Sequence, residues 1–257
     1  MLLSVMAIAA STSCAKDDNT GTSNNGSSGG SNEVIDVKYT MGYYHPAKKI
    51  KKINPHDELF GDEYVFLWDG DNLKSITIKN QPYPDVVFEC HYSNNGYITS
   101  WTEHEEGYDD DIRTFDYKKN SIVEVTPLGD NVMYTFDNNG VLTKIGNKLV
   151  TMLNGNAVKI GTQNYIYDEQ PNPFLNLLFP SIQLYFTWPM EDMNDGCSVA
   201  SKNNGLYSNY VATGDNDDYY WDIEYDADGW PIRWYSVTNN GTSSSGVHTI
   251  YTIEYYN

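Results

Sequence analysis

Hydrophobic and polar residues alternate in short runs from Tyr64 to the end of the chain. In Val86–Trp101 and in Met133–Ile145, two alternating runs flank an Asn-Asn-Gly sequence. Alternation places one face of a strand on a core. Asn and Gly supply the positive φ angles that tight hairpin turns require. The pattern therefore predicts a series of antiparallel hairpins.

The clearest copy of this hairpin unit is Tyr225–Tyr235, YDADGWPIRWY, in which an aromatic residue precedes an Asp-Gly turn and packs across the hairpin. The copies are irregularly spaced, which disfavours a solenoid of fixed rise. We expect an all-β fold, an antiparallel meander of successive hairpins that forms a curved sheet or a partly closed barrel. The imperfect copies are Tyr64–Ile78, Val86–Trp101, Arg113–Val125, Met133–Ile145, Leu149–Ile160 and Asn164–Phe174.

Two of the turns, Asp226–Gly229 and Asp69–Asn72, are rich enough in oxygen ligands to be compared with calcium loops. A helix-flanked calcium loop needs an acid at its twelfth position, where this chain has Val237. We therefore interpret both segments as hairpin turns and expect no metal site in them.

Two segments interrupt the strand pattern. Residues 174–180 are short and apolar, and we expect at most one short helix there, either plugging an end of the sheet or exposed for a partner. Pro189–Asp218 lacks a clear strand. Long loops often carry function, so Asp215, Asp217 and Asp218 mark a candidate binding loop, with a flexible surface as the alternative.

The N-terminal region predicts where the protein is located. Residues 1–13 are apolar and then small, as in a signal peptide, and Cys14 follows directly. This start resembles a bacterial lipobox, which implies that Cys14 is the lipid attachment site. Residues 14–32 form a Gly/Ser-rich, lipid-anchored flexible tether. Residues 33–257 form a single β domain of YD-like hairpin repeats.

The charge and the motif search narrow the function. The chain has 35 acidic and 16 basic residues, for a net charge of −19. That charge repels nucleic-acid phosphates, so we expect no nucleic-acid partner. We find no phosphate-binding Gly loop, no nucleophile elbow and no pair of His residues at metal-ligand spacing. We expect no cofactor and assign no catalytic residue.

Three side-chain groups keep alternatives open. His104 and its acidic neighbours suit a solvated hairpin loop or a weak cation site. Cys90 and Cys197 are either free or paired in an oxidising compartment. Abundant carboxylates leave glycosidase chemistry open, because such chemistry depends on a separation across a cleft that a sequence does not give.

The lipobox-like start, the tether, the hairpins and the element YDEQPNPF at Tyr167–Phe174 together resemble a family of surface lipoproteins of unknown function from gut Bacteroides. The hairpins also resemble relaxed YD repeats of the Rhs type. The resemblance implies a porin-like, curved β-sheet and brings no catalytic residues. Lys16, Asp17 and Asp18 resemble the export signal of such lipoproteins, which implies exposure at the cell surface, with the periplasmic face of the outer membrane as the alternative.

Our leading hypothesis is a non-enzymatic binding module on the cell envelope, held to the membrane through its N-terminal lipid. Tyr and Trp on a sheet suit a glycan or a protein partner, although most of them are expected to pack within the sheet. The alternatives are a glycan-acting hydrolase that uses a carboxylate pair and a structural envelope protein.

Overall fold

A computed structural model describes residues 34–55, 63–79, 83–126, 129, 131–179, 200–212, 215–239 and 246–257. Within 207–212, 215–221, 236–239 and 246–250 the description covers the backbone alone. These residues form sixteen strands: β1 (Ile50–Pro55), β2 (Glu63–Asp69), β3 (Asn72–Lys79), β4 (Val86–Tyr92), β5 (Ile98–Glu105), β6 (Asp111–Lys118), β7 (Ser121–Val125), β8 (Val132–Phe136), β9 (Leu142–Ile145), β10 (Lys148–Leu153), β11 (Asn156–Ile160), β12 (Gln163–Pro171), β13 (Asn203–Ala212), β14 (Asp215–Tyr225), β15 (Pro231–Asn239) and β16 (Gly246–Tyr255).

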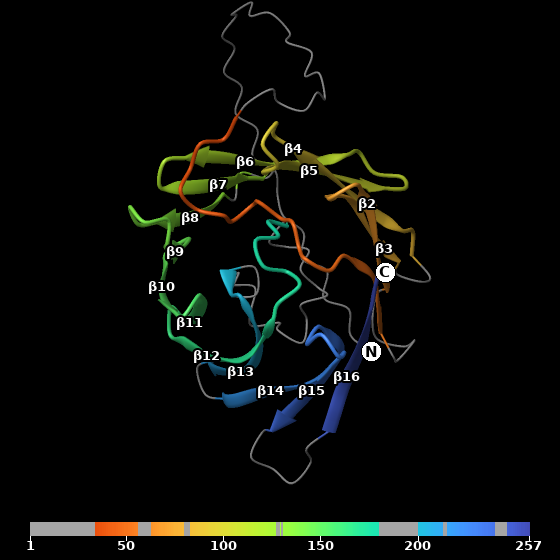
Figure 1. Cartoon of the computed structure of the whole chain (residues 1–257), viewed down its shortest axis with the longest axis vertical. Coiled ribbons are helices and arrows are strands. Elements are labelled where there is room, and N and C mark those ends of the chain that lie inside the picture. Colours follow the sequence, from red (N-terminus) through yellow and green to blue (C-terminus); the bar gives the residue numbers. More distant parts are fainter. Residues whose placement is uncertain are drawn as a thin grey trace, which may run out of the picture.

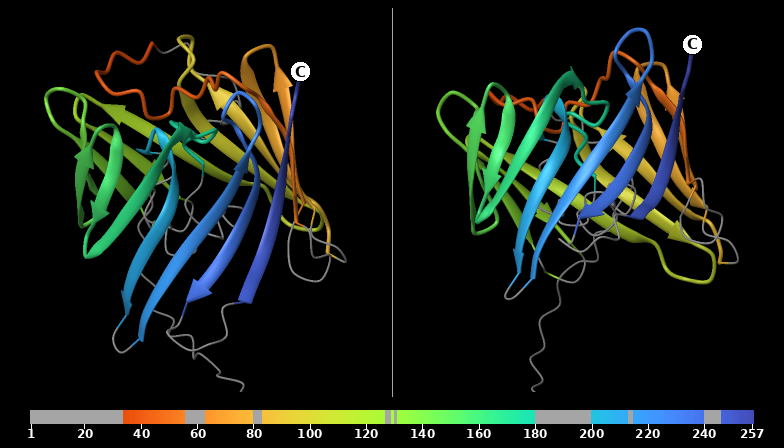
Figure 2. Two further views of the ribbon diagram at one scale, coloured as in Figure 1. Left: turned by 60° about the horizontal axis from the view of Figure 1, so that its bottom comes forward. Right: turned by 90° about the horizontal axis from the view of Figure 1, so that it is seen from below.

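Each strand pairs antiparallel with the strand before it, and β16 returns to pair with β1. At this closure Ile53 lies opposite Ile253. The sheet is therefore a closed barrel whose strands run round the ring in chain order (Figures 1 and 2). The predicted antiparallel meander is confirmed, and the closure is complete where a partial one was an option.

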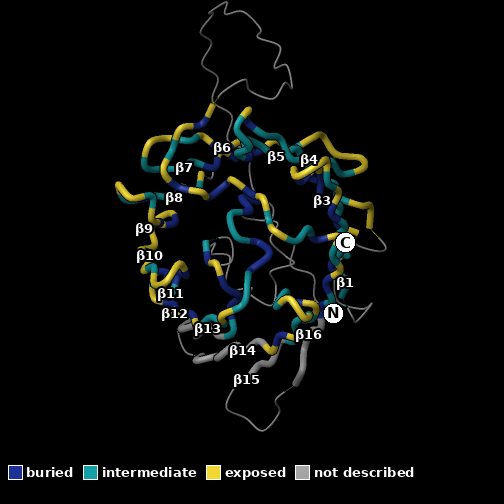
Figure 3. Tube along the Cα trace, in the orientation of Figure 1, coloured by how far each residue is buried: buried dark blue, intermediate teal, exposed yellow. Residues whose placement is uncertain are grey.

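The strand pattern sorts side chains between the two faces of the barrel wall. In β6, Arg113 and Phe115 are buried while their neighbours Thr114 and Asp116 are exposed. A similar exchange of buried and exposed positions runs along β3, and Figure 3 colours the described residues by their burial. Several outward-facing charges pair across strands, such as Lys51 with Glu254. In the described part of the chain, no helix is long and apolar enough to cross a membrane.

A sixteen-stranded barrel is wider than its own wall side chains can fill. Two inner segments occupy the space here, a strap (residues 34–49) and a plug (residues 172–179), seen inside the ring in Figure 1. Tyr44 of the strap donates a hydrogen bond to the carbonyl of Pro173, at 2.9 Å. The buried residues that they contribute are Ile35, Tyr39, Met41, Gly42, Tyr44, Asn172, Pro173, Phe174, Leu177, Leu178 and Phe179.

The plug forms turns at residues 173–176, and no helix is found in residues 172–179. Phe174, Leu177, Leu178 and Phe179 point into the core, so the interpretation as an internal plug is confirmed and the exposed alternative is wrong for these four residues. Trp101 in the barrel wall donates to the carbonyl of Leu178, at 2.7 Å. Phe179 packs against Trp101 and Phe88, with ring centroids 4.8 and 5.0 Å apart.

The hairpin turns follow the predicted chemistry. Asp226 accepts hydrogen bonds from the backbone N–H groups of Asp228 and Trp230, both at 2.9 Å, and Gly229 has φ of 83°. The other carboxylate oxygen of Asp226 accepts from Lys48. The carboxylate is thus committed to its own turn and to a lysine, as a turn residue is expected to be.

Candidate functional site

The candidate site is a groove of about 490 Å³ at the end of the barrel where the strap lies. It is bounded by the strap, the plug, the β8–β9 turn and the β10–β11 turn. We call it the mouth groove. Its lining residues are Tyr39, Thr40, Met41, Phe136, Gly140, Val141, Leu142, Met152, Asn154, Gly155, Leu175, Asn176, Ala200 and Lys202.

The floor of the mouth groove is apolar and fixed. The ring of Tyr39 stacks on Phe136 with centroids 3.9 Å apart and planes inclined by 10°. The Tyr39 hydroxyl donates toward the carbonyl oxygens of Lys118 and Ser121, at 2.7 and 2.9 Å. Burial raises the pKa of Tyr39, so this hydroxyl stays protonated and anchors the strap to the β6–β7 hairpin.

The rim of the mouth groove is polar. Thr40 donates to the side-chain oxygen of Asn176, at 3.1 Å, which leaves the Asn176 amide N–H₂ directed elsewhere. Asn154 sits at the β10–β11 turn with φ of 52°, a left-handed conformation that Asn adopts more readily than most residues. The rim therefore offers hydroxyl and amide groups, which both donate and accept hydrogen bonds.

One cation, Lys202, completes the rim. Its methylene groups lie over Gly155, where an added Cβ would be 3.0 Å from Cδ of the lysine. Its backbone N–H donates to the carbonyl of Gly155, and its carbonyl accepts from Asn172, both at 3.0 Å. The lining residues that the structure describes include no Asp, Glu, His or Cys. As described, the mouth groove offers groups for binding and none of the usual acid–base pairs.

A second cluster of chemical interest lies on the inner face of β5–β7. Arg113 is 5% exposed and lies 3.9 Å from Glu124 and 3.8 Å from Asp111. Glu103 faces Asp111 directly across the β5–β6 pair. Burial raises the pKa of Glu103, Arg113 opposes that rise, and Asp111 adds to it. This carboxylate pair is separate from the mouth groove.

The predicted binding-loop residues lie in a strand. Asp215, Asp217 and Asp218 belong to β14, where they pair with Ala212, Tyr210 and Asn209 of β13. The interpretation of this stretch as a loop is therefore wrong. Pairing with β13 along its length, and with β15 from Asp218 onward, holds an Asp-rich segment that has low strand propensity by itself. Their side chains lie outside the described part of the structure.

The N-terminal targeting residues also lie outside the described residues. They are the signal peptide, Cys14, the segment Lys16, Asp17 and Asp18, and the tether. The lipid attachment and the export signal remain predictions from the sequence.

The remaining chemical candidates are engaged in ordinary contacts. His104 lies 2.7 Å from Asp110 and 3.8 Å from Glu89, within the β4–β6 wall. No group of three or more His, Cys, Asp and Glu side chains suited to a metal was found among the described residues. Cys90 is a free thiol whose pKa is raised by burial, and Cys197 is outside the described ranges.

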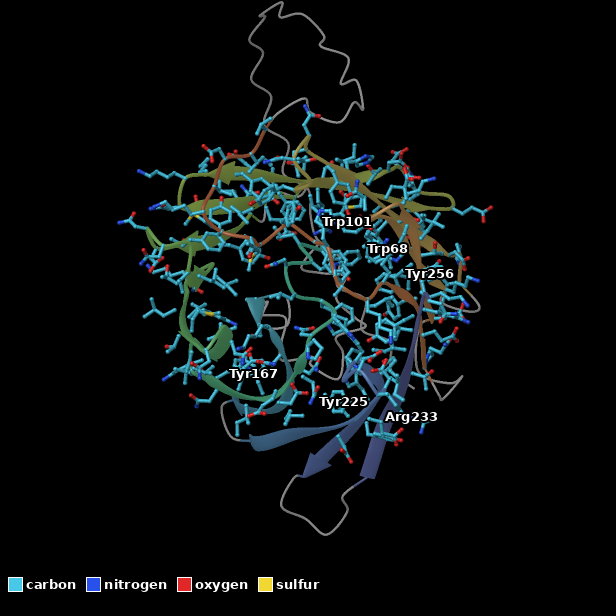
Figure 4. All side chains as sticks on the ribbon, viewed as in Figure 1. Trp68, Trp101, Tyr167, Tyr225, Arg233 and Tyr256 are labelled. Carbon is cyan, nitrogen blue, oxygen red and sulfur yellow. The ribbon has the colours of Figure 1, made fainter. Side chains whose placement is uncertain are left out.

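Most of the described aromatic residues pack in the core, as we expected from the sequence. Figure 4 labels several of them. Trp68 donates to the carbonyl of Ile50 at 2.7 Å, and Tyr167 donates to that of Ala157 at 2.7 Å. Tyr225 donates to Asp168. The exposed tyrosines come from separate elements, the strap, the loops and the C-terminus: Tyr43, Tyr83, Tyr108 and Tyr256.

Sequence reasoning missed the residues of the mouth groove. Thr40, Asn154, Asn176 and Lys202 come from four segments that approach one another only after the barrel closes. A weak signal existed at Gly140 and Gly155, which are turn glycines whose conformation lets other segments approach. Gly140 has φ of 83°, and an added Cβ would be 2.5 Å from the carbonyl oxygen of Lys38.

The fold and groove together define a closed antiparallel β-barrel that is plugged from within and carries a candidate binding groove at one end. Among solved structures, the chain is similar to a porin-like protein from Bacteroides uniformis, with 12% identity and a TM-score of 0.42 over 82% of this chain and 100% of that one. It is also similar to a porin-like protein from Bacteroides vulgatus, with 10% identity and a TM-score of 0.42 over 81% and 99% of the two chains. No protein-family model matches the chain, and no curated protein matches it.

Proposed function

We propose that this chain is a cell-envelope lipoprotein whose barrel is a non-catalytic binding module, with the mouth groove as its ligand site and a glycan as its ligand. The observation that carries the proposal is the groove itself, a concavity of about 490 Å³ with an apolar floor and a polar rim. Small-molecule sites have this volume and this mixture of apolar surface with a few placed polar groups.

The rim favours a saccharide over an extended peptide. Hydroxyl groups of a sugar both donate and accept, which suits the amides of Asn154 and Asn176 and the hydroxyl of Thr40. A peptide that binds by adding a strand needs a free sheet edge. Every strand of the closed barrel is paired on both sides. The apolar C–H faces of a sugar ring suit the exposed Val141 and the partly buried Leu175.

The location proposal rests on the sequence. Cys14 would carry the lipid, residues 14–32 would tether the domain, and residues 16–18 would direct export to the cell surface. The periplasmic face of the outer membrane is the alternative location. A tether before a compact barrel would let the mouth groove reach a ligand at a distance from the membrane.

Glycan-array binding by a soluble protein of residues 33–257 tests the ligand class. Val141→Trp should abolish binding, because it places an indole in the mouth groove at a residue already 42% exposed. Val125→Trp is the matched control, since Val125 is 40% exposed and does not line the groove. Loss of binding in both variants, or in neither, would place the ligand elsewhere.

The anchor has its own test. Cys14→Ala should release the full-length protein from the membrane fraction, whereas Cys90→Ala should leave it bound. Membrane association of the Cys14→Ala variant after a carbonate wash would refute lipid anchoring.

A glycan-acting hydrolase remains the second candidate because Glu103 and Asp111 form a facing carboxylate pair in which the pKa of Glu103 is raised. If array ligands are cleaved, Glu103→Gln should stop cleavage while binding persists. Cleavage that survives Glu103→Gln would remove this pair as its source. Absence of both binding and cleavage would favour a structural role in the envelope.

A further inference from the structure

The proposed function leaves the class of glycan open, and the charges around the mouth groove narrow it. We propose that the mouth groove selects a saccharide bearing a carboxylate, and that the ammonium of Lys202 recognises this carboxylate. The inference rests on the proposed function, because it names the ligand class of the same site.

Among the residues that the structure describes, Lys202 is the sole charged one that lines the mouth groove, in a chain whose net charge is −19. Other lysines near this end of the barrel are already engaged. Lys48 pairs with Asp226, and Lys49 pairs with Asp71. Within the described ranges, Lys202 has no carboxylate at ion-pair distance.

One acidic residue that adjoins the groove, Asp137, is engaged by its own turn. Asp137 precedes the β8–β9 turn, and one of its carboxylate oxygens accepts hydrogen bonds from the backbone N–H groups of Asn139 and Val141, at 2.8 and 2.9 Å. The neighbouring Lys38 donates to the carbonyl of Asn138, at 2.9 Å, which adds a second positive charge beside the turn. Two lysines therefore flank this rim in a molecule whose overall charge is negative.

Contacts within the protein also hold Lys202 in position at the groove. Its stem lies over Gly155, and two backbone hydrogen bonds fix the position of the residue. A prepositioned stem loses less conformational freedom when the ammonium pairs with a ligand. The amide groups of Asn154 and Asn176 line the same groove and provide hydrogen-bond donors for a second carboxylate oxygen or for ring hydroxyls.

The exposure of Lys202 to solvent sets the size of the expected gain in affinity. Because Lys202 is solvent-exposed, an ion pair there is expected to contribute about a fivefold gain in affinity, and added salt should weaken it. Neutral relatives of the ligand should still bind through the floor and the amides. The site would therefore show a preference for the acidic form and not an absolute requirement.

The experiment uses residues 33–257 on an array of neutral, uronate-bearing and sialate-bearing glycans. Calorimetry then compares each bound acidic glycan with its methyl ester, which keeps the sugar and removes the charge. The wild-type protein should prefer the acid about fivefold in dilute buffer. Lys202→Met should bind acid and ester equally, and Lys202→Arg should keep the preference.

The matched control is Lys159→Met, which removes the same charge from an exposed residue of β11 that does not line the groove. It should retain the full preference. Equal binding of acid and ester by the wild-type protein, or binding of neutral glycans alone, would overturn the inference and leave the proposed function standing. An acid preference that survives Lys202→Met would overturn the assignment to this lysine. Binding of no glycan by the wild-type protein would overturn the proposed function, and this inference with it.

Discussion

At the scale of single residues, three turns repeat one geometry. In each, the backbone N–H of the first residue donates to the carbonyl of the fifth, and the carbonyl of the first accepts from the N–H of the fourth. The fourth residue is a glycine with φ between 83° and 85°. The first residues are Ser93, Asp137 and Asp226, and the side chain of each accepts from the fifth backbone N–H. These three hairpins therefore share one turn geometry.

Where the strap passes such a turn, the glycine also leaves room for the backbone of the strap. Gly140→Ala should destabilise the protein by more than Gly146→Ala, because a Cβ at 140 would be 2.5 Å from the backbone oxygen of Lys38. Gly146 also has positive φ, at 56°, but a Cβ there would meet nothing within 4 Å. The cost at 146 should be about 1–2 kcal/mol, from backbone conformation alone. Urea denaturation measures both, and equal costs would show that the strap contact is unimportant.

The carboxylate of the same turn predicts a pH dependence. Backbone N–H groups of Val141 and Asn139 hold the pKa of Asp137 below its usual range. Its contribution to stability is therefore present above the unfolded-state pKa of about 3.9 and is lost as the pH falls through the folded-state pKa.

Asp137→Asn keeps an oxygen acceptor and removes the titration. The stability advantage of the wild type over this variant should be largest near neutral pH and should shrink below about pH 4. Urea midpoints measured from pH 7 to pH 2.5 check this. An advantage that stays constant over that range would contradict the assignment.

Residue-scale reasoning from the sequence predicted the turns because their chemistry is local. Asp, Asn and Gly carry the needed hydrogen bonds and φ angles within five residues. It did not predict that Gly140 contacts Lys38, because that contact joins segments about 100 positions apart. The mouth groove was missed for the same reason.

At the scale of elements, the plug shows what an apolar segment without strand alternation can do. Residues 174–179 lack a partner strand, and they bury their side chains inside the ring instead. The sequence left two options for this segment, burial inside the sheet or exposure to a partner, and allowed a short helix. The segment instead forms turns at residues 173–176, where Asn172 accepts from the backbone N–H of Phe174 at 2.9 Å and Asn176 has φ of 68°.

Phe179→Ala should lower the free energy of unfolding by about 3–5 kcal/mol, since it removes a ring packed on Trp101 and Phe88 and leaves a cavity. Leu153→Ala, at a residue 58% exposed, is the control and should change stability by less than about 0.5 kcal/mol. Thermal or urea denaturation compares them. Similar small effects in both variants would mean that the plug is not part of the cooperative core.

The strand β14 shows the opposite failure of local reasoning. Its first residues, Asp215–Asp218, read as a turn because Asp and Asn are poor strand formers. In the barrel, Asp218 lies between Asn209 of β13 and Asn239 of β15. Pairing on both sides overrides the local preference, and only the complete sheet supplies those partners.

At the scale of the whole molecule, the folded unit begins before its first strand. The strap contributes Tyr39, Met41 and Tyr44 to the core although β1 begins at Ile50. Composition predicted a domain from residue 33, and the burial of these three side chains gives a physical reason for including the strap. The sequence predicted a curved sheet or a partly closed barrel and did not predict the complete ring, since curvature depends on the register of every pair.

A protein that begins at Ile50 should be far less stable than one that begins at Glu33. Loss of three buried side chains removes roughly 5–9 kcal/mol, which is comparable to the whole stability of a typical domain. Binding of a hydrophobic dye and loss of a cooperative thermal transition would report it. Equal melting temperatures for the two proteins would show that the strap is a passive cover.

The pairing of β1 with β16 also sets an order of events in time. Asn54 bonds to Glu254, 200 positions away, at 3.1 Å. A chain made or exported from its N-terminus holds β1 with one open edge until β16 emerges. Such distant pairing makes closure a late and slow step. During that interval the exposed edge of β1 can pair with a strand of another chain. We therefore expect that a chaperone must bind the nascent protein until β16 is available for pairing.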